Sequence, residues 1–134
     1  MSINKSSKIS QIVPGVMNDE DKKKIIKIIE TIEKEPYSIE FQNPVDVEGL
    51  GLLDYFNYVK YPMDLGTVKR KIKDSKYVMV QEALDDIQQI WVNCKIYNME
   101  GSDIYKMAES LEKLFKKVQE AEQRQFDTMV NLLK

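Results

Sequence analysis

The apolar residues between Val80 and Tyr97 recur at alternating spacings of three and four, and this pattern most limits what the chain can fold into. Such spacing places them on one face of an α-helix, and a face this apolar must be buried against other elements. The residues of the face are Val80, Ala83, Leu84, Ile87, Ile90, Trp91, Cys94 and Tyr97. We therefore expect a helix over 80–97 that packs inside a bundle.

Three further segments show the same helical period. The first can be capped by Asn18 or Asp19 and should end before Pro36, because a residue that precedes proline resists helical angles. The second can be capped by Asp64 and the third by Ser102. Their apolar stripes are, in order, Ile25, Ile28, Ile29 and Ile32; Leu65, Val68 and Ile72; and Ile104, Met107 or Ala108, Leu111, Leu114, Phe115 and Val118. With 134 residues and no strand-like alternation, the sequence predicts one all-α domain built as a four-helix bundle.

The two ends of the chain differ from the predicted bundle, which we place at residues 18–120. Residues 1–17 are polar, contain Pro14 and Gly15 and show no helical period, so we expect a flexible arm. Residues 121–134 continue the helical pattern beyond the length that a compact bundle requires. We expect them to form a helical extension that either folds back on the first helix or docks on a partner.

The composition narrows the classes of function. The chain has one cysteine and no histidine, so it lacks the commonest general base and the commonest ligand of transition metals. We therefore expect no enzyme activity, no metal and no cofactor. An enzyme that uses carboxylates, or Cys94 as a nucleophile, is a disfavoured alternative because no histidine is present to activate the thiol. A net charge of −2 and the lack of a long apolar run predict neither direct nucleic-acid binding nor a membrane-spanning segment.

Residues 37–63 form an unusually long connection between the first two helices. Pro44, Gly49, Gly51 and Pro62 interrupt regular structure, whereas the many apolar residues of the segment argue against disorder. These are Phe41, Val45, Leu50, Leu52, Leu53, Tyr55, Phe56, Val59 and Met63. Two interpretations stay open: the loop is a lid over the core, or it lines a pocket, since pockets have mostly apolar walls with a few polar groups.

Asn98 directly follows the apolar face of the 80–97 helix and precedes the turn-forming residues 99–102. One interpretation is a C-cap, because asparagine tolerates left-handed backbone angles. The other is that its carboxamide points into the end of the bundle, where it offers one acceptor and two donor hydrogens to a ligand. The residues by themselves leave both interpretations open.

Four separated segments of the chain carry a family resemblance. They are Asn43-Pro44-Val45-Asp46 with Leu50, Leu52 and Asp54-Tyr55-Phe56; Tyr61-Pro62-Met63-Asp64-Leu65-Gly66-Thr67-Val68; Asn93-Cys94-Lys95-Ile96-Tyr97-Asn98; and Ala108-Glu109-Ser110-Leu111-Glu112-Lys113-Leu114-Phe115. In their order and spacing, over about residues 22–120, they resemble the bromodomain family, and within it the BET-type modules. The resemblance implies a left-handed four-helix bundle, with the long loop between the first and second helices, that binds acetylated lysine.

The resemblance also implies roles for individual residues. Asn98 would donate an amide N–H to the acetyl carbonyl oxygen, and the Tyr55 hydroxyl would reach the same oxygen through an ordered water. Cys94 would lie near the floor of the pocket. The implied walls are Tyr97, Val45, Leu50, Leu52, Phe41 and, at the gatekeeper position, Ile104. The Trp-Pro-Phe shelf of the family is replaced here by Ile39-Glu40-Phe41, so the aromatic shelf is reduced.

Partners and location follow from the same resemblance. It implies binding to acetylated histone tails, of H4 or H3, or to other acetylated proteins, as part of a larger chromatin protein that regulates transcription in the nucleus. It implies no cofactor and no direct contact with nucleic acid or membrane. One alternative stays open beside it, which is a structural or dimerising helical bundle with a degenerate pocket.

Overall fold

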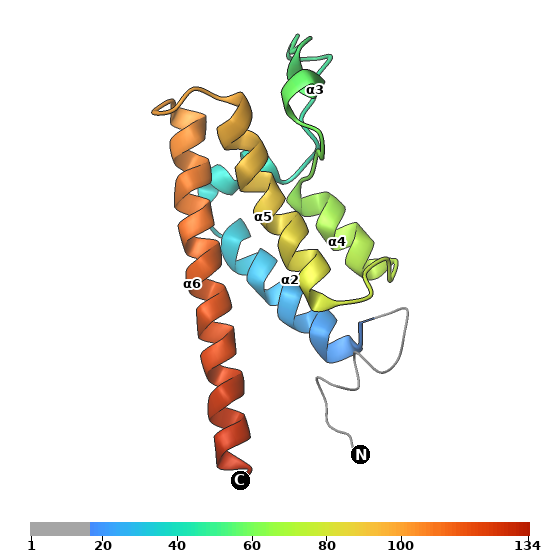
Figure 1. The fold of residues 1–134 in the computed structure, drawn as a ribbon, viewed down its shortest axis with the longest axis vertical. Coiled ribbons are helices and arrows are strands. Elements are labelled where there is room, and N and C mark those ends of the chain that lie inside the picture. The colour runs from blue at the N-terminus through green and yellow to red at the C-terminus, as the bar shows by residue number, and fades with distance from the viewer. Residues whose placement is uncertain (1–16) are drawn as a thin grey trace.

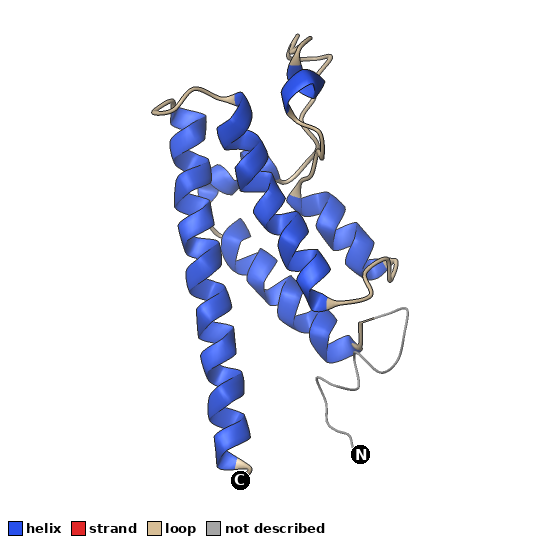
Figure 2. Ribbon diagram, in the orientation of Figure 1, coloured by secondary structure: helices blue, strands red, loops and turns tan. Residues whose placement is uncertain are grey.

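A computed structural model describes residues 17–134, and these form a bundle of four main helices (Figures 1 and 2). The main helices are α2 (Asp19–Glu33), α4 (Leu65–Lys73), α5 (Val80–Tyr97) and α6 (Asp103–Leu132). The described part of the chain contains no strand, and the predicted all-α bundle is confirmed. Of the predicted N-terminal arm, only Met17 lies within the described residues, and its side chain is buried in the core.

Polar residues cap the N-termini of three main helices at the predicted positions. The side chains of Asn18, Asp64 and Ser102 each accept a hydrogen bond from the backbone N–H three residues later, at 2.8, 2.9 and 3.4 Å. Each bond satisfies a donor that the first turn of a helix leaves without a partner. The start of α5 has no such side chain, and Glu82 instead reaches back to the backbone N–H groups of Val78 and Met79.

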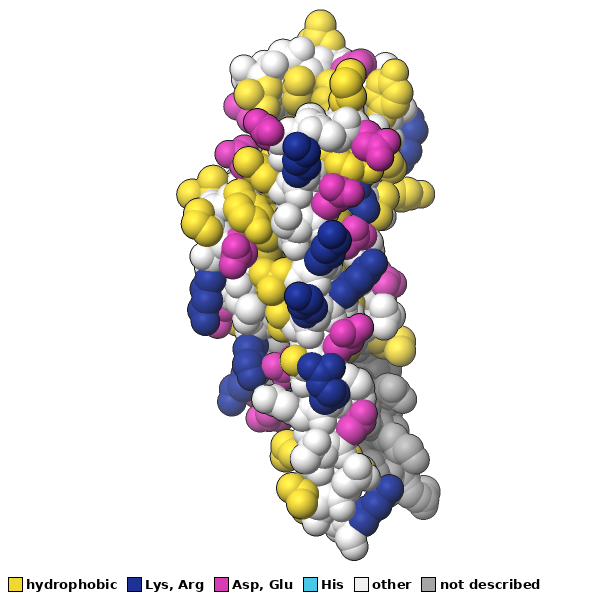
Figure 3. All heavy atoms as spheres, turned by 90° about the vertical axis from the view of Figure 1, so that its left-hand side faces the viewer, with side chains coloured by type: hydrophobic (Ala, Val, Ile, Leu, Met, Phe, Trp, Pro, Cys, Tyr) yellow, Lys and Arg dark blue, Asp and Glu magenta, His cyan; other side chains and the backbone are white. Residues whose placement is uncertain are grey.

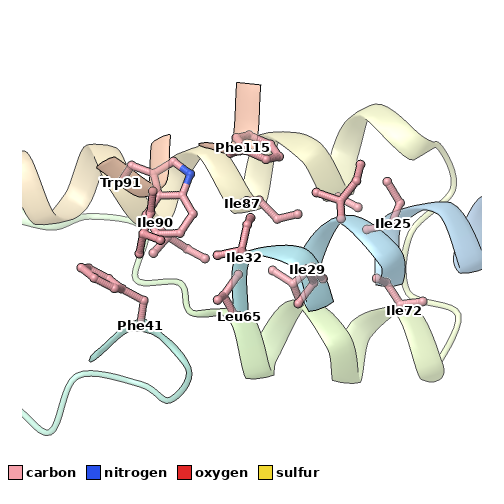
Figure 4. Close-up of a cluster of buried hydrophobic side chains, with 14 of the residues drawn as sticks. Ile25, Ile29, Ile32, Phe41, Leu65, Ile72, Ile87, Ile90, Trp91 and Phe115 are labelled. Carbon is pink, nitrogen blue, oxygen red and sulfur yellow. The ribbon is translucent and has the colours of Figure 1, made fainter. Parts of the chain in front are cut away.

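The core lies where the apolar stripes of the helices meet. Trp91 of α5 and Phe115 of α6 are fully buried, and the Phe41 ring meets the Trp91 ring edge-on at 5.5 Å between centroids (Figure 4). The predicted face of α5 is buried over most of its length. Its members Val80, Leu84 and Tyr97 remain partly exposed.

The last helix is much longer than its neighbours and extends past the bundle (Figure 1). The first part of the predicted extension lies against α2, where Lys27 Nζ is 3.0 Å from Glu122 Oε2 and Lys24 Nζ is 5.1 Å from the centre of the Phe126 ring. Figure 3 shows basic and acidic side chains interspersed along the molecular face that contains α6. Beyond Phe126 the apolar side chains of the helix are exposed.

The long connection between α2 and α4 is more ordered than a bare loop. It contains the 3-10 helix η1 (Pro36–Phe41) and the single-turn helix α3 (Tyr55–Tyr58), neither of which we predicted. Near its beginning, the carbonyl of Gln42 accepts a hydrogen bond from the N–H of Gly66 at 3.1 Å. A Cβ atom at Gly66 would lie 2.6 Å from that carbonyl oxygen, so this close approach requires glycine.

Near its end, the connection is attached to α5 by a buried asparagine. Asn93 is 4 % exposed, and its Nδ2 donates a hydrogen bond to the backbone carbonyl of Tyr61 at 2.8 Å. Its Oδ1 accepts a hydrogen bond from Gln89 at 2.7 Å. Both halves of the Asn93 amide are therefore satisfied, and the loop is attached to the helix that it faces.

Replacing this asparagine should weaken the fold. In Asn93→Ala the Tyr61 carbonyl and the Gln89 amide lose their partner, and we expect the free energy of unfolding to fall by about 1–2 kcal/mol. Chemical denaturation followed by circular dichroism measures this change. Asn131→Ala, at an exposed position of α6, is the control. Equal unfolding free energies for the two variants would show that the attachment adds nothing to stability.

Candidate functional site

A cavity of about 480 Å³ lies at the end of the bundle where α5 stops. Its walls come from η1, the long loop, the last turns of α5 and the start of α6. All nine residues that the family resemblance singles out contribute to it. They are Phe41, Val45, Leu50, Leu52, Tyr55, Cys94, Tyr97, Asn98 and Ile104. Of the two interpretations of the long loop, the one in which it lines a pocket is therefore confirmed.

Asn98 is both the C-cap of α5 and a residue of the cavity wall. Its backbone is extended (φ −98°, ψ 150°), so this cap does not use the left-handed conformation that asparagine tolerates, and the turn takes that conformation at Gly101 (φ 86°) instead. The Cys94 carbonyl accepts hydrogen bonds from the Asn98 backbone N–H at 3.0 Å and from its Nδ2 at 2.9 Å. Nδ2 also lies 3.5 Å from Cys94 Sγ, which is a weak acceptor, whereas Oδ1 has no partner among the described residues.

Two tyrosines form an aromatic wall beside this amide. The rings of Tyr55 and Tyr97 meet edge-on at 4.9 Å between centroids. The Tyr97 hydroxyl donates a hydrogen bond to Asp54 at 2.7 Å, which connects the end of α5 to the loop just before α3. This hydrogen bond raises the pKa of Tyr97, and burial raises the pKa of Tyr55. Both phenols therefore stay protonated at neutral pH.

The Tyr55 hydroxyl is available for a ligand. The residue is only 6 % exposed, yet its hydroxyl makes no hydrogen bond with any of residues 17–134. A phenol of this kind can both donate and accept. A polar group that faces a cavity without a protein partner is best satisfied by a ligand or by ordered water.

Cys94 forms part of the cavity floor, and its thiol is buried and protonated at neutral pH. It is 8 % exposed, and its Sγ donates a weak hydrogen bond to the Ile104 carbonyl at 3.4 Å. Burial raises the pKa of the Cys94 thiol to about 11. Since the thiolate is the nucleophile, the thiol is poorly suited to covalent catalysis near neutral pH.

The three residues that replace the family shelf differ in their burial. Phe41 points inward against Trp91, whereas Ile39 is 65 % exposed and Glu40 is also exposed. Seven further residues line the cavity, and none of them is among the ligand-binding residues that the resemblance implies. They are Asn43, Pro44, Asp46, Met63, Asp64, Ile90 and Asn93. Most of them belong to the quoted family motifs, so the motifs were a usable signal for them.

Within residues 17–134, no three His, Cys, Asp or Glu side chains are grouped so that they can hold a metal ion. None of the described helices combines the length and apolar character needed to cross a membrane. The cavity at the end of α5 is thus the candidate site.

Cys94 gives a direct test of the cavity floor, because it is the sole cysteine of the chain. We expect alkylation by iodoacetamide at pH 8 to be at least about tenfold slower in the folded protein than in urea, since a raised thiol pKa lowers the thiolate fraction. The folded-state rate should continue to rise with pH up to about 11. Mass spectrometry follows the adduct, and equal rates in folded and unfolded protein would contradict the buried floor.

Comparison with known proteins agrees with this geometry. The bromodomain family profile matches residues 25–110. Transcription factor GTE1 of Arabidopsis thaliana is 43 % identical over 95 residues, which cover 65 % of this chain and 25 % of that protein. The chain thus spans about a quarter of the length of this relative. With more than half of its residues matched, and the cavity walled by the positions that the family motifs indicate, the chain belongs to the bromodomain family.

Proposed function

We propose that the cavity binds the side chain of acetylated lysine, and that the chain is a non-catalytic reader module for acetylated histone tails. The bromodomain family is a family of acetyl-lysine readers, and the relative described above is a transcription factor. A role in transcription, in the nucleus and within a larger chromatin protein, is consistent with both. The observation that carries the proposal is an oriented, incompletely paired Asn98 amide at an otherwise largely apolar cavity.

The cavity discriminates first by charge. An unmodified lysine carries an ammonium group, and moving it from water into a mostly apolar pocket is costly. Acetylation removes this charge and leaves a neutral amide. The aliphatic and aromatic walls formed by residues such as Val45, Leu52 and Ile104 then favour the acetylated side chain.

Asn98 and Tyr55 add recognition of the amide itself. The Nδ2 hydrogen that the Cys94 carbonyl does not use faces only the weak acceptor Cys94 Sγ, at 3.5 Å, and donates instead to the acetyl carbonyl oxygen. The Tyr55 hydroxyl, which has no partner among the described residues, contacts the same oxygen through a bridging water. An unmodified lysine offers no such acceptor, so the Asn98 amide would be left unpaired at a cost of about 1–3 kcal/mol.

The acetyl-lysine side chain is a small ligand, which limits the affinity of a single site. We expect a net binding free energy of roughly −4 to −7 kcal/mol, which corresponds to a Kd between about 1 mM and about 10 μM. Stable targeting then depends on further contacts, such as a second mark, a neighbouring reader or the residues that flank the mark.

The dimerising bundle remains the second candidate, and one observation favours it. The end of α6 exposes Met129, Leu132 and Leu133, at 63, 80 and 85 % of their surface. Such apolar side chains can form a contact between helices, but this contact gives no role to the cavity. Light scattering over a range of protein concentrations tests this candidate, and a constant monomeric mass would exclude it.

Removal of the Asn98 amide tests the reader function. We expect Asn98→Ala to keep the fold and to weaken binding of an acetylated histone H4 tail peptide at least about tenfold, the scale of one lost buried hydrogen bond. Isothermal titration calorimetry measures the affinity, and circular dichroism checks the fold. Asn57→Ala is the matched control, because Asn57 is exposed on α3 and does not line the cavity. A folded Asn98→Ala protein with unchanged affinity would refute the assigned role.

A further inference from the structure

The charged residues that line the cavity are all acidic. Glu40, Asp46 and Asp64 contribute to its walls, and within residues 17–134 no lysine or arginine does so. Asp64 is buried and caps α4, where both its oxygens accept hydrogen bonds from Thr67. Asp46 accepts a hydrogen bond from the N–H of Gly49 at 2.9 Å. Glu40 alone of the three has no hydrogen bond or ion pair to any other described residue.

The backbone of Glu40 is held in place by its neighbours, although its side chain is exposed. It lies on η1 between Ile39 and Phe41, and the Phe41 ring is anchored in the core against Trp91. Ser38 of the same 3-10 helix is fully buried and also anchors it.

The hydrogen bonds around Ser38 reach both neighbouring segments. Its hydroxyl donates to the carbonyl of Glu33 at the end of α2, at 3.3 Å, and accepts from the Gln42 side chain at 3.1 Å. The Gln42 carbonyl is in turn bound by the N–H of Gly66. The backbone that carries Glu40 is therefore connected to α2 and α4, so the carboxylate starts from a defined point on the cavity wall.

We propose that Glu40 selects peptides in which the acetylated lysine is accompanied by a free lysine or arginine a few residues away. The inference rests on the proposed reader function and names its substrate class more closely. The cavity takes the neutral acetylated side chain, while the Glu40 carboxylate at its wall attracts a cation that stays partly in water. The Tyr55 hydroxyl, which has no partner among the described residues, lines the same cavity as Glu40 and is left for the acetylated side chain.

The expected effect is modest, because Glu40 is exposed. An exposed ion pair changes affinity by about two- to fivefold. The effect should shrink as salt rises from about 50 mM to about 500 mM, since the screening length falls well below 10 Å. Contacts in the apolar part of the cavity should be much less sensitive to salt.

The test uses peptides that share one acetyl-lysine and differ at one flanking position. Each of the three positions on either side of the mark carries lysine or glutamine in turn, and calorimetry measures the affinity of the wild type, Glu40→Gln and Glu40→Lys. Glu30→Gln is the matched control, because Glu30 is exposed on α2, makes no ion pair with the described residues and does not line the cavity. It changes the net charge of the protein by the same amount as Glu40→Gln.

We expect the wild type and Glu30→Gln to prefer lysine over glutamine by about two- to fivefold at one or more positions. Glu40→Gln should lose this preference while still requiring acetylation, and Glu40→Lys should reverse it. Acetyl-dependent binding with the same flanking preference in all four proteins would overturn the role of Glu40 and leave the reader function intact. Absence of acetyl-dependent binding in the folded wild type would overturn both.

Discussion

Burial of one apolar face of α5 is the constraint on which the rest of the structure depends. That face packs against α2, α4 and α6, and its largest member, Trp91, is fully enclosed. Because side chains on a helix repeat every 3.6 residues, burial of Trp91 and Cys94 also fixes the direction in which Asn98 leaves the helix. The bundle and the cavity are therefore consequences of the same packing. A rotation of α5 would expose the core and misdirect the Asn98 amide together.

The long loop forms one wall of the cavity because three hydrogen bonds attach it to the rest of the bundle. The buried Asn93 amide holds the Tyr61 carbonyl, the Gly66 N–H holds the Gln42 carbonyl, and Tyr97 holds Asp54. Between these points the loop has few buried side chains, and residues such as Leu50 stay exposed. Val45, Leu50 and Leu52 thus line the cavity, whereas Phe41 and Val59 are buried. This arrangement leaves space for a ligand between the loop and α5.

Much of this architecture was predictable from the sequence, because it depends on local patterns. The main helices and the caps at Asn18, Asp64 and Ser102 follow from periodicity and cap chemistry, and the lining residues follow from motif resemblance. The short helices η1 and α3 were missed because so few residues carry no usable period. The contact between Asn93 and Tyr61 joins residues that are distant in sequence. The lack of a partner for the Glu40 side chain depends on where the other charged residues lie in the fold. They emerge only from the folded arrangement.

In the proposed function, the cavity distinguishes acetylated from unmodified lysine by charge and by one amide hydrogen bond. The most direct measurement is a calorimetric titration of the wild-type protein with two histone H4 tail peptides that are identical except for lysine acetylation. We expect saturable binding of the acetylated peptide, with a Kd no weaker than about 1 mM, and no measurable binding of the unmodified one. Equal affinity for both peptides, or no binding of the acetylated peptide to folded protein, would contradict the proposed function.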